Sequence, residues 1–336
     1  MMVLNRKALR AAVVGAFALT SMFLLFLGDH ADQAPGFRIL QKKKSKMFFD
    51  NRPISFTHIP KCGGVSFGSE MEPKFNSHDC FATMKREGTM NVVFLRSPRK
   101  HVRSQHGECY FDPQWGLKVT KNTLFPRTDN YTEDFSQWLH HFSMLSENQI
   151  GPDHDFNCYD PRELQTRYMS CLSAGSCEAN HALVGEPPSL EQALINLNDA
   201  DFVGLTDFYH ESICMLHYRR EEELPVGCNC NEAANKITHV HETHGVPNLS
   251  DEWTADVIEL VDSFTLLDRA LFKHALNRFQ RDLLEVEQKA GVPVLCDRSK
   301  MEVLSSTYPP KPTKEEIDAV YKEFEDSDKR TAIMTK

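Results

Sequence analysis

Residues 58–66, His-Ile-Pro-Lys-Cys-Gly-Gly-Val-Ser, combine a cation, a glycine pair and a hydroxyl in a spacing suited to binding an anion. Lys61 supplies a full positive charge, and Gly63 and Gly64 allow backbone amides to approach a ligand closely. A helix beginning after the glycines adds N–H donors and a favourable dipole. The lysine precedes the glycines, so this is not a Walker A loop. The alternative interpretation is an ordinary strand–helix turn.

Residues 96–104, Arg-Ser-Pro-Arg-Lys-His-Val-Arg-Ser, form a second segment of this kind. An arginine can hold a phosphate through two parallel hydrogen bonds, and Arg96 directly follows an apolar run. Ser104 comes eight residues later, two turns into an expected helix, and its hydroxyl can complete the contact. Taken alone, a basic strand–helix junction of this kind is usually a solvated helix start.

The elements around these segments predict an α/β fold with a parallel sheet. Apolar or β-branched runs at 54–59, 91–95 and 201–205 are typical of strands, and the run at 91–95 is typical of a strand buried on both faces. The segment 75–78 is either a short strand or an extended segment. Strands alternating with helices give a parallel sheet whose ligands bind at the carboxyl ends of the strands. Both basic segments follow such ends. The expected helices are 65–71, 99–108, 132–145, 161–171, 189–197, 207–218, 251–262, 266–286 and 314–326.

The beginning of the chain predicts a membrane anchor. Residues 11–28 contain no charged side chain and follow Arg6, Lys7 and Arg10, which indicates a type II signal-anchor rather than a cleaved signal peptide. We therefore expect a cytoplasmic tail at 1–10, a transmembrane helix at 11–28, a stem at 29–50, a lumenal domain at 51–298 and a polar C-terminal extension at 299–336.

Ten cysteines and two sequons fit an oxidising lumen, with glycosylation expected at Asn130 and Asn248. Cys62 is expected to be a free thiol and Cys214 a buried one. The net charge of −9 lies in the body of the chain, because the first 46 residues are basic, and an acidic body argues against nucleic acid as a partner.

Together, the two basic segments resemble the PAPS-dependent sulfotransferases, most closely the Golgi carbohydrate branch that includes the heparan sulfate 2-O- and 6-O-sulfotransferases. In that family one strand ends in His-[Ile/Val]-Pro-Lys-[Thr/Ser]-Gly-Gly-Thr-[Ser/Thr] and binds the 5′-phosphosulfate. A second strand ends in Arg-[Asp/Asn]-Pro, with a serine eight residues after the arginine, and binds the 3′-phosphate. Residues 202–208 and 267–275 are similar to two further family segments, so the resemblance spans roughly 54–280.

The resemblance implies a sulfotransferase fold, a P-loop-like parallel sheet, and PAPS as co-substrate without a metal. The implied PAPS contacts are Lys61, Cys62, Gly63, Gly64, Val65, Ser66, Arg96 and Ser104. Two positions depart from the family pattern: Cys62 replaces a hydroxyl residue with a weaker donor, and Ser97 replaces an acidic or amide residue.

The implied reaction transfers a sulfuryl group to a hydroxyl of a glycan or proteoglycan chain in the Golgi lumen. Lys61 would neutralise the leaving group and His78 would take the acceptor's proton, with His106 as the other candidate base. His58 precedes the loop and is expected to orient it, and the resemblance assigns 235–244 to closing over the nucleotide.

Several alternatives stay open at this point. The same fold serves protein-tyrosine sulfotransferases, P-loop kinases and non-catalytic glycan-binding modules. Cys228, Cys230 and three histidines at 239–244 form a weaker zinc pattern. Arg99, Lys100, Arg103 and Arg127 could line a basic track for the acceptor. The sequence indicates neither the acceptor nor the oligomeric state.

Overall fold

A computed structural model describes residues 52–71, 75–78, 88–112, 127–128, 130–144, 159–171, 188–231, 253–308 and 312–322, with the backbone alone for 75–78. These residues all belong to one compact unit, 48–336. The predicted tail, anchor and stem at 1–50 lie outside the described residues. Within the described ranges, no helix is both long enough and apolar enough to cross a membrane.

Four parallel strands form the central sheet, as the sequence predicts. They are β1 (Ile54–Thr57), β2 (Phe75–His78), β3 (Met90–Leu95) and β4 (Phe202–Leu205), in the order β2-β1-β3-β4. Every residue of β1, β3 and β4 is buried, which explains their continuous apolar runs. All strands run the same way, so the carboxyl ends of β1, β3 and β4 meet at one edge.

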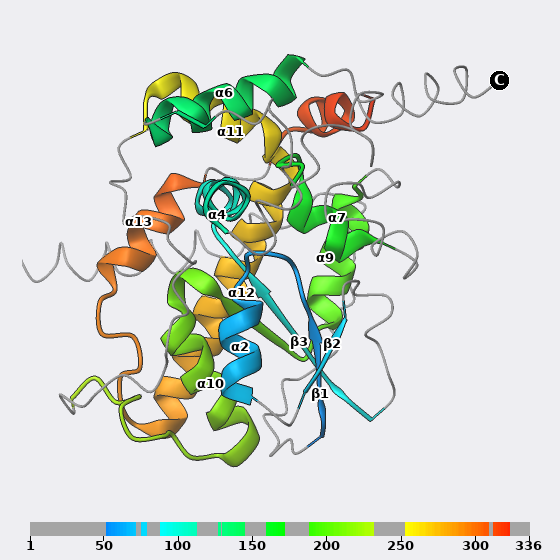
Figure 1. Cartoon of the computed structure of the whole chain (residues 1–336). Helices are drawn as coiled ribbons and strands as arrows, with labels where there is room; N and C mark the ends of the chain where they lie inside the picture. Colours follow the sequence, from blue (N-terminus) through cyan, green and yellow to red (C-terminus); the bar gives the residue numbers. More distant parts are fainter. Residues whose placement is uncertain are drawn as a thin grey trace, which may run out of the picture. The chain divides into compact units, whose positions relative to one another are not determined.

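Helices flank this sheet (Figure 1), and α12 contacts β4, α7, α9 and α10. α12 (Leu266–Ala290) buries one stripe of apolar residues along its length and ends at Gly291, whose left-handed φ of 71° suits a glycine cap. Further helices are α2 (Gly64–Met71), α4 (Pro98–Phe111), α6 (Tyr131–Met144), α7 (Leu164–Ser170), α9 (Leu190–Asp199), α10 (Tyr209–Glu221), α11 (Ala255–Phe264) and α13 (Ser299–Thr307). Residues 314–322 are also helical, within the helix predicted at 314–326.

Aromatic packing fixes α2 against the sheet. The ring of Phe67 on α2 lies 4.4 Å from that of Phe56 on β1 and 5.4 Å from that of Phe94 on β3. Phe94 in turn lies 5.7 Å from Tyr209 on α10. Because offset and tilted aromatic pairs are favourable, this cluster holds the start of α2, and therefore the loop before it, in one position.

Among the described residues, one disulfide ties α10 to the segment after it, and another ties that segment to residue 296. Cys214 pairs with Cys228, and Cys230 pairs with Cys296. The prediction of disulfides is confirmed, but the prediction of Cys214 as a free thiol is wrong. Its apolar surroundings are those of a buried cysteine, and a burial pattern cannot distinguish a thiol from a buried half-cystine.

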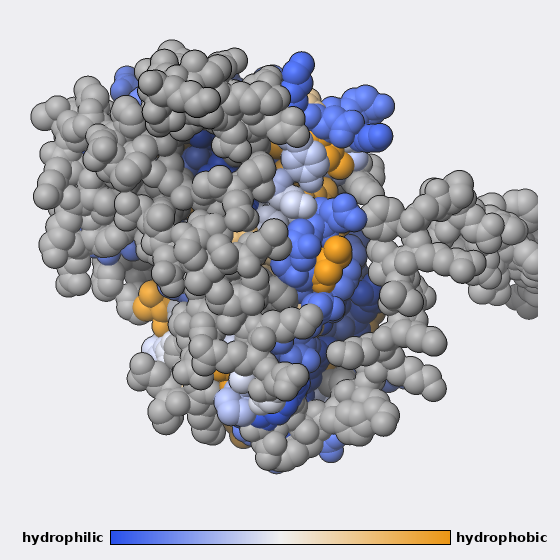
Figure 2. All heavy atoms as spheres, turned by 90° about the vertical axis from the view of Figure 1, so that its right-hand side faces the viewer, coloured by the Kyte–Doolittle hydropathy of each residue, from blue (hydrophilic) through white to orange (hydrophobic). Residues whose placement is uncertain are grey.

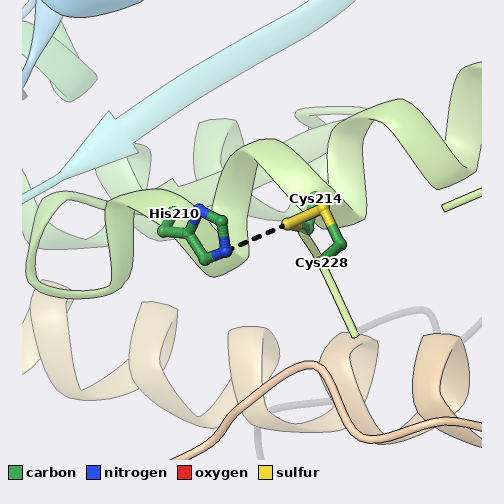
Figure 3. A group of neighbouring side chains, drawn as sticks. All are labelled: His210, Cys214 and Cys228. Carbon is green, nitrogen blue, oxygen red and sulfur yellow. Dashed lines mark hydrogen bonds between the residues drawn. A yellow bond between two sulfur atoms is a disulfide. The ribbon is translucent and has the colours of Figure 1, made fainter. Parts of the chain in front are cut away.

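The zinc pattern loses its cysteine ligands, because Cys228 and Cys230 are both oxidised. His210 Nε2 lies 3.7 Å from Cys214 Sγ and 3.1 Å from the carbonyl of Gly227 (Figure 3). A disulfide sulfur is not the thiolate that zinc requires, so the group of His210, Cys214 and Cys228 is a structural contact in this state.

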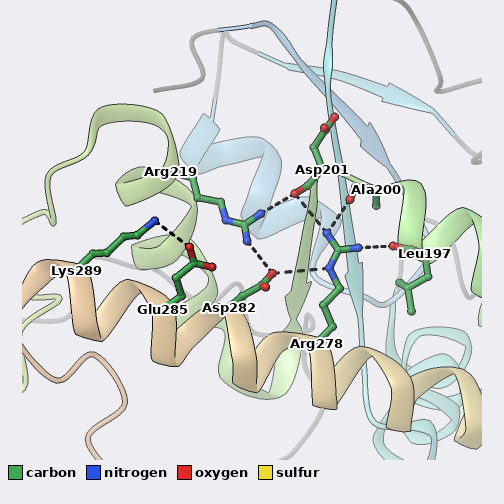
Figure 4. Close-up of polar contacts among 8 residues, drawn as sticks. All are labelled: Leu197, Ala200, Asp201, Arg219, Arg278, Asp282, Glu285 and Lys289. Carbon is green, nitrogen blue, oxygen red and sulfur yellow. Dashed lines mark hydrogen bonds and ion pairs between the residues drawn. The ribbon is translucent and has the colours of Figure 1, made fainter. Parts of the chain in front are cut away.

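The turn before β4 is held by two arginines that share one carboxylate (Figure 4). Arg219 donates to Asp282 at 2.7 Å and to the carbonyl of Asp201 at 2.6 Å. Arg278 lies 3.7 Å from the same carboxylate and donates to the carbonyl of Ala200 at 2.7 Å. This network ties α10 and α12 to the amino end of β4, opposite the edge where the basic segments lie.

The segment after residue 298 packs onto the same unit. Lys273 on α12 donates to the carbonyl of Ser305 at 2.7 Å, and the Tyr308 ring lies 5.2 Å from that of Phe272. The part of the chain beginning at α13 is therefore continuous with the domain.

Exposed large apolar side chains are scattered over separate elements, and the described surface in Figure 2 is mainly hydrophilic.

α7 and α12 cap each other's amino ends with buried carboxylates. Glu163 accepts hydrogen bonds from the backbone N–H groups of Leu267 at 2.9 Å and Asp268 at 2.8 Å. Asp268 accepts from the backbone N–H of Thr166 at 2.7 Å and of Gln165 at 3.2 Å. Each carboxylate accepts from helix N–H groups that have no partner within the helix. Each also interacts favourably with the positive end of the helix dipole.

Burial raises the pKa of both capping carboxyls, that of Asp268 to about 6 and that of Glu163 well above its usual range. The native protein therefore holds protons that the unfolded chain releases near pH 4. Unfolding releases a proton between about pH 4 and 6, so this contribution to stability is present below that window and is lost as the pH rises through it.

We expect the unfolding free energy of the wild type to fall relative to that of Asp268→Asn, by on the order of 1–3 kcal/mol between pH 4 and 7, because the variant lacks the titrating group. Urea denaturation of both proteins at several pH values measures this difference. A constant difference across the range would contradict the assignment.

Candidate anion-binding site

The loop between β1 and α2 has the backbone expected of an anion cradle. Lys61 and Gly63 have left-handed φ angles of 63° and 83°. The first helical hydrogen bond runs from Phe67 N to Gly63 O at 2.9 Å, so the amides before it lie at the open amino end of α2. The cation, the glycines and the helix terminus therefore meet at the carboxyl edge of the sheet.

Gly64 permits a close contact that no other residue could make. A Cβ at this position would lie 2.1 Å from Cδ2 of His58, well inside the contact distance of two carbon atoms. The ring of His58 therefore packs directly over the glycine backbone. The orienting role expected of His58 stays a prediction.

The side-chain amide of Gln165 joins the two predicted segments. Its Oε1 accepts from the backbone N–H of Arg96 at 2.9 Å, and its Nε2 donates to the carbonyl of Arg96 at 2.9 Å. Cys62 Sγ donates to the same Oε1 at 3.5 Å. The guanidinium of Arg96 completes the junction by donating to the carbonyl of Lys61 at 3.1 Å. The two segments thus form one connected structure.

Cys62 faces the protein interior at this junction. Its side chain is 1% exposed, and its backbone N–H donates to the carbonyl of Ile59 at 3.1 Å. Burial raises the pKa of the Cys62 thiol, so the sulfur stays protonated at neutral pH. Both donors of Cys62 are occupied within the protein, which leaves charge and backbone elsewhere in the loop to hold an anion.

One face of α4 lies against the loop. His101 Nδ1 accepts from Gln105 Nε2 at 3.0 Å, which leaves Nε2–H to donate to the carbonyl of Pro60 at 2.8 Å. Burial lowers the pKa of His101 to about 3, so the ring is neutral, as this pairing requires. Further along α4, Glu108 forms an ion pair with the ammonium of Lys61. Ser104, one helical turn before Glu108, is 9% exposed.

The strand end of β4 is attached to the second segment through Asp207. Its carboxylate accepts from the backbone N–H of Ser97 at 2.7 Å and from the Ser97 hydroxyl at 2.9 Å, and it lies 3.3 Å from Lys100 Nζ. Lys300 on α13 donates to the backbone carbonyl of Asp207. The carboxyl ends of β1, β3 and β4 are therefore cross-linked by polar contacts.

The residues proposed as a basic track have partners within the protein. Arg99 makes a two-point contact with Asp262 at 2.9 and 2.7 Å, and Lys100 pairs with Asp207. Arg127 donates to the carbonyl of Cys109 at 3.1 Å. These pairs reduce the positive potential that the sequence suggested along this side of α4.

The two candidate bases occupy different environments. The backbone of His78 ends β2 in register with Thr57, so this residue is at the same edge as the loop at 58–63. His106 is fully buried among the rings of Tyr110, Tyr131, Phe135 and Trp138, at centroid distances of 5.0 to 5.6 Å. Burial lowers its pKa to about 3, which makes His106 a weak base at neutral pH.

Of the two sequons, one is described. Asn130 is exposed, and its Oδ1 caps α6 by accepting from the backbone N–H of Glu133 at 3.3 Å. This bond uses the oxygen and leaves the side-chain nitrogen available for modification. Asn248 and the predicted closing loop at 235–244 lie outside the described residues.

Three site residues escaped sequence reasoning. Gln165 lies about 70 residues from Arg96 in the chain, and no local pattern marks it. Glu108 and His101 could have been found, because they lie four residues after and three residues before Ser104, on one face of the expected helix. Hydroxyls and cations are the usual signs of an anion site, so a carboxylate such as Glu108 does not stand out among them.

Comparison with known proteins gave no match: the chain matches no protein-family model, no curated protein and no solved structure.

We expect Gly64→Ala to destabilise the protein by about 1–3 kcal/mol, because the added methyl group overlaps the His58 ring. Combining it with His58→Ala removes the overlap, so the double variant should lose less stability than the two single variants added together. Thermal or urea denaturation of the four proteins measures this coupling. Strict additivity would show that His58 does not pack on Gly64 in solution.

Proposed function

We propose that the protein is a PAPS-dependent sulfotransferase that acts on a hydroxyl of a carbohydrate acceptor in the Golgi lumen. The observation that carries the proposal is the junction of the two basic segments at the carboxyl edge of the parallel sheet, where the Arg96 guanidinium reaches the carbonyl of Lys61. Each segment thus brings one cation to this edge, as the two phosphate-bearing ends of one nucleotide require. The proposed fold is that of the sulfotransferases.

The residues present fit such a co-substrate in several ways. The amino end of α2 supplies amides, Gly63 and Gly64 leave the backbone accessible, and Lys61 adds charge for a 5′-phosphosulfate. Arg96 and Ser104 would hold the 3′-phosphate. Ser97 replaces the acidic or amide residue of the resembling family, and here a carboxylate reaches that position from Asp207 instead.

When bound, PAPS supplies an activated sulfuryl group attached to a phosphate leaving group. The Lys61 ammonium is the residue that would balance charge developing on the leaving oxygen. His78 would accept the proton of the acceptor hydroxyl as the new sulfur–oxygen bond forms and the old one breaks. The chain thus contributes positioning and charge, which is what in-line group transfer requires.

The proposed setting in the Golgi, with a type II anchor at 11–28, rests on the sequence and is compatible with the two disulfides. A protein-tyrosine sulfotransferase and a non-catalytic glycan-binding module remain the competing proposals. They differ in what they do with an acceptor, so one set of transfer measurements separates them.

We expect Lys61→Ala to lower sulfate transfer from PAPS by roughly 100-fold or more, since removal of a group that stabilises transition-state charge typically costs this much. Lys289→Ala, which removes an exposed lysine on α12, is the matched control and should leave the rate unchanged. The assay follows radiolabelled sulfate from PAPS to a panel of glycans and tyrosine peptides. Transfer only to peptides would favour the tyrosine alternative. If the wild type binds adenosine 3′,5′-bisphosphate without transferring sulfate, the binding-module alternative stands, and if it binds no nucleotide the proposal fails.

For His78→Asn we expect a rate lowered by about 10²–10⁴-fold with an unchanged dissociation constant for adenosine 3′,5′-bisphosphate, as befits a general base. His274→Asn on α12 is the matched control, because His274 contacts Asn198, on the last turn of α9. Single-turnover kinetics and calorimetry give the two quantities. A rate that survives the substitution would assign the base elsewhere.

A further inference from the structure

Through its ion pair with Lys61, Glu108 on α4 places a negative charge against the loop that is proposed to bind an anion. The side chains of Lys61 and Glu108 are 16% and 19% exposed, so water screens the pair only partly. An anion arriving at Lys61 therefore meets a carboxylate already in contact with the same ammonium. A role for Glu108 in anion binding rests on the proposed function and deepens it.

Glu108 is held at this place by α4 rather than by a loop. The same face of α4 carries His101, which donates to the carbonyl of Pro60 next to Lys61. Ser104, a proposed contact of the 3′-phosphate, lies between them on this face. The helix thus holds the carboxylate of Glu108 at a fixed position beside the loop. The ammonium of Lys61 can move, because its four-carbon side chain is flexible.

The charges around Glu108 make its contact with Lys61 important. Asp112, which ends α4, is buried, and together with Glu108 it lies close enough to Tyr159 to raise the pKa of that phenol, after the larger effect of burial. On the other side, Arg96 donates to the carbonyl of Lys61. The ammonium of Lys61 is thus the cation in direct contact with Glu108.

We propose that Glu108 is a positioning residue that holds the Lys61 ammonium in the donor-free protein and must yield it to the donor, so that it lowers the affinity of the loop for every anion that contacts Lys61. An anion with a single weak contact cannot displace the carboxylate. A nucleotide that also engages Arg96 and Ser104 gains enough from its second anionic group to do so. The ion pair thereby raises the affinity that a ligand must gain from its other contacts, and a bis-anionic nucleotide has such contacts at Arg96 and Ser104.

Glu108→Gln tests this role, because it removes the charge and keeps the shape of the side chain. Calorimetry on the purified full-length chain compares the binding of adenosine 3′,5′-bisphosphate and of adenosine 5′-monophosphate. We expect both to bind more tightly to the variant, each by a similar factor of roughly tenfold, because both must displace the same carboxylate from Lys61 in the wild type. Glu285→Gln on α12 makes the same change of net charge at a distance from the loop and should alter neither constant.

The possible outcomes separate the role of Glu108 from the proposed function. If the wild type binds no nucleotide, the proposed function fails first. If the wild type binds the bisphosphate but Glu108→Gln binds it equally or more weakly, the role of Glu108 fails alone. Loss of transfer in the variant at saturating PAPS, with unchanged binding, would instead make Glu108 an acid–base group. Should Glu108→Gln not fold, Glu108→Asp keeps the charge but moves it away from Lys61 by one methylene. We then expect a smaller gain in affinity for the two nucleotides. The absence of any gain would contradict the proposal.

Discussion

The side-chain amide of Gln165 extends the hydrogen bonding of β3 beyond the end of the strand, and the candidate site depends on it. The backbone N–H and C=O of Arg96 both pair with this amide, as they would with a neighbouring strand in a sheet. Gln165 itself is fixed at the amino end of α7 by Asp268, and Asp268 is positioned by the cap that Glu163 provides for α12. The position of Arg96 is therefore set by a helix pair far away in the sequence.

This dependence explains why two carboxyls remain buried at a position where neutral residues would cost less desolvation. A buried carboxylate is tolerated when backbone N–H groups satisfy it, and each of these two satisfies the end of the other's helix. The reciprocal caps fix the register between α7 and α12. A shift of either helix would move Gln165, and with it the guanidinium that reaches the loop after β1.

Compensation of charge is the second general feature of the site. Lys61 pairs with Glu108, Arg99 with Asp262 and Lys100 with Asp207, so cations near the carboxyl edge are matched by nearby acids. Such an arrangement keeps the apo protein stable despite the clustered positive charge. Under the proposed function, anion binding at this edge would be an exchange of partners. The acidic net charge of the body would then be compatible with such a site, because local pairing rather than net charge would decide which anion can enter.

Local patterns in the sequence were enough to locate most strands and helices, but they did not predict the side-chain contacts between them. Apolar runs located β3 and β4, since burial on both faces leaves a continuous apolar signal, whereas β2 (Phe-Asn-Ser-His) lacks such a run and could equally have been an extended segment. α12 was found because its apolar stripe repeats at helical spacing. α13 was missed, because its nine residues are mostly polar and only Met301 and Leu304 are buried. Lys61 and Arg96 were found through glycine and charge patterns at strand ends. Gln165, by contrast, is recognisable only after the chain has folded, because its function comes from a neighbour about 70 residues away.

The same limit applies to Ser97. A serine at this position looks like the loss of a useful acid when the local segment is considered alone, yet the fold returns a carboxylate to it from the end of β4. Asp207 accepts hydrogen bonds from both donors of Ser97 and so anchors the end of β4 to the start of α4. The carboxyl edge of a parallel sheet brings the ends of several strands together, so a charge that one loop lacks can be supplied by the loop of a neighbouring strand.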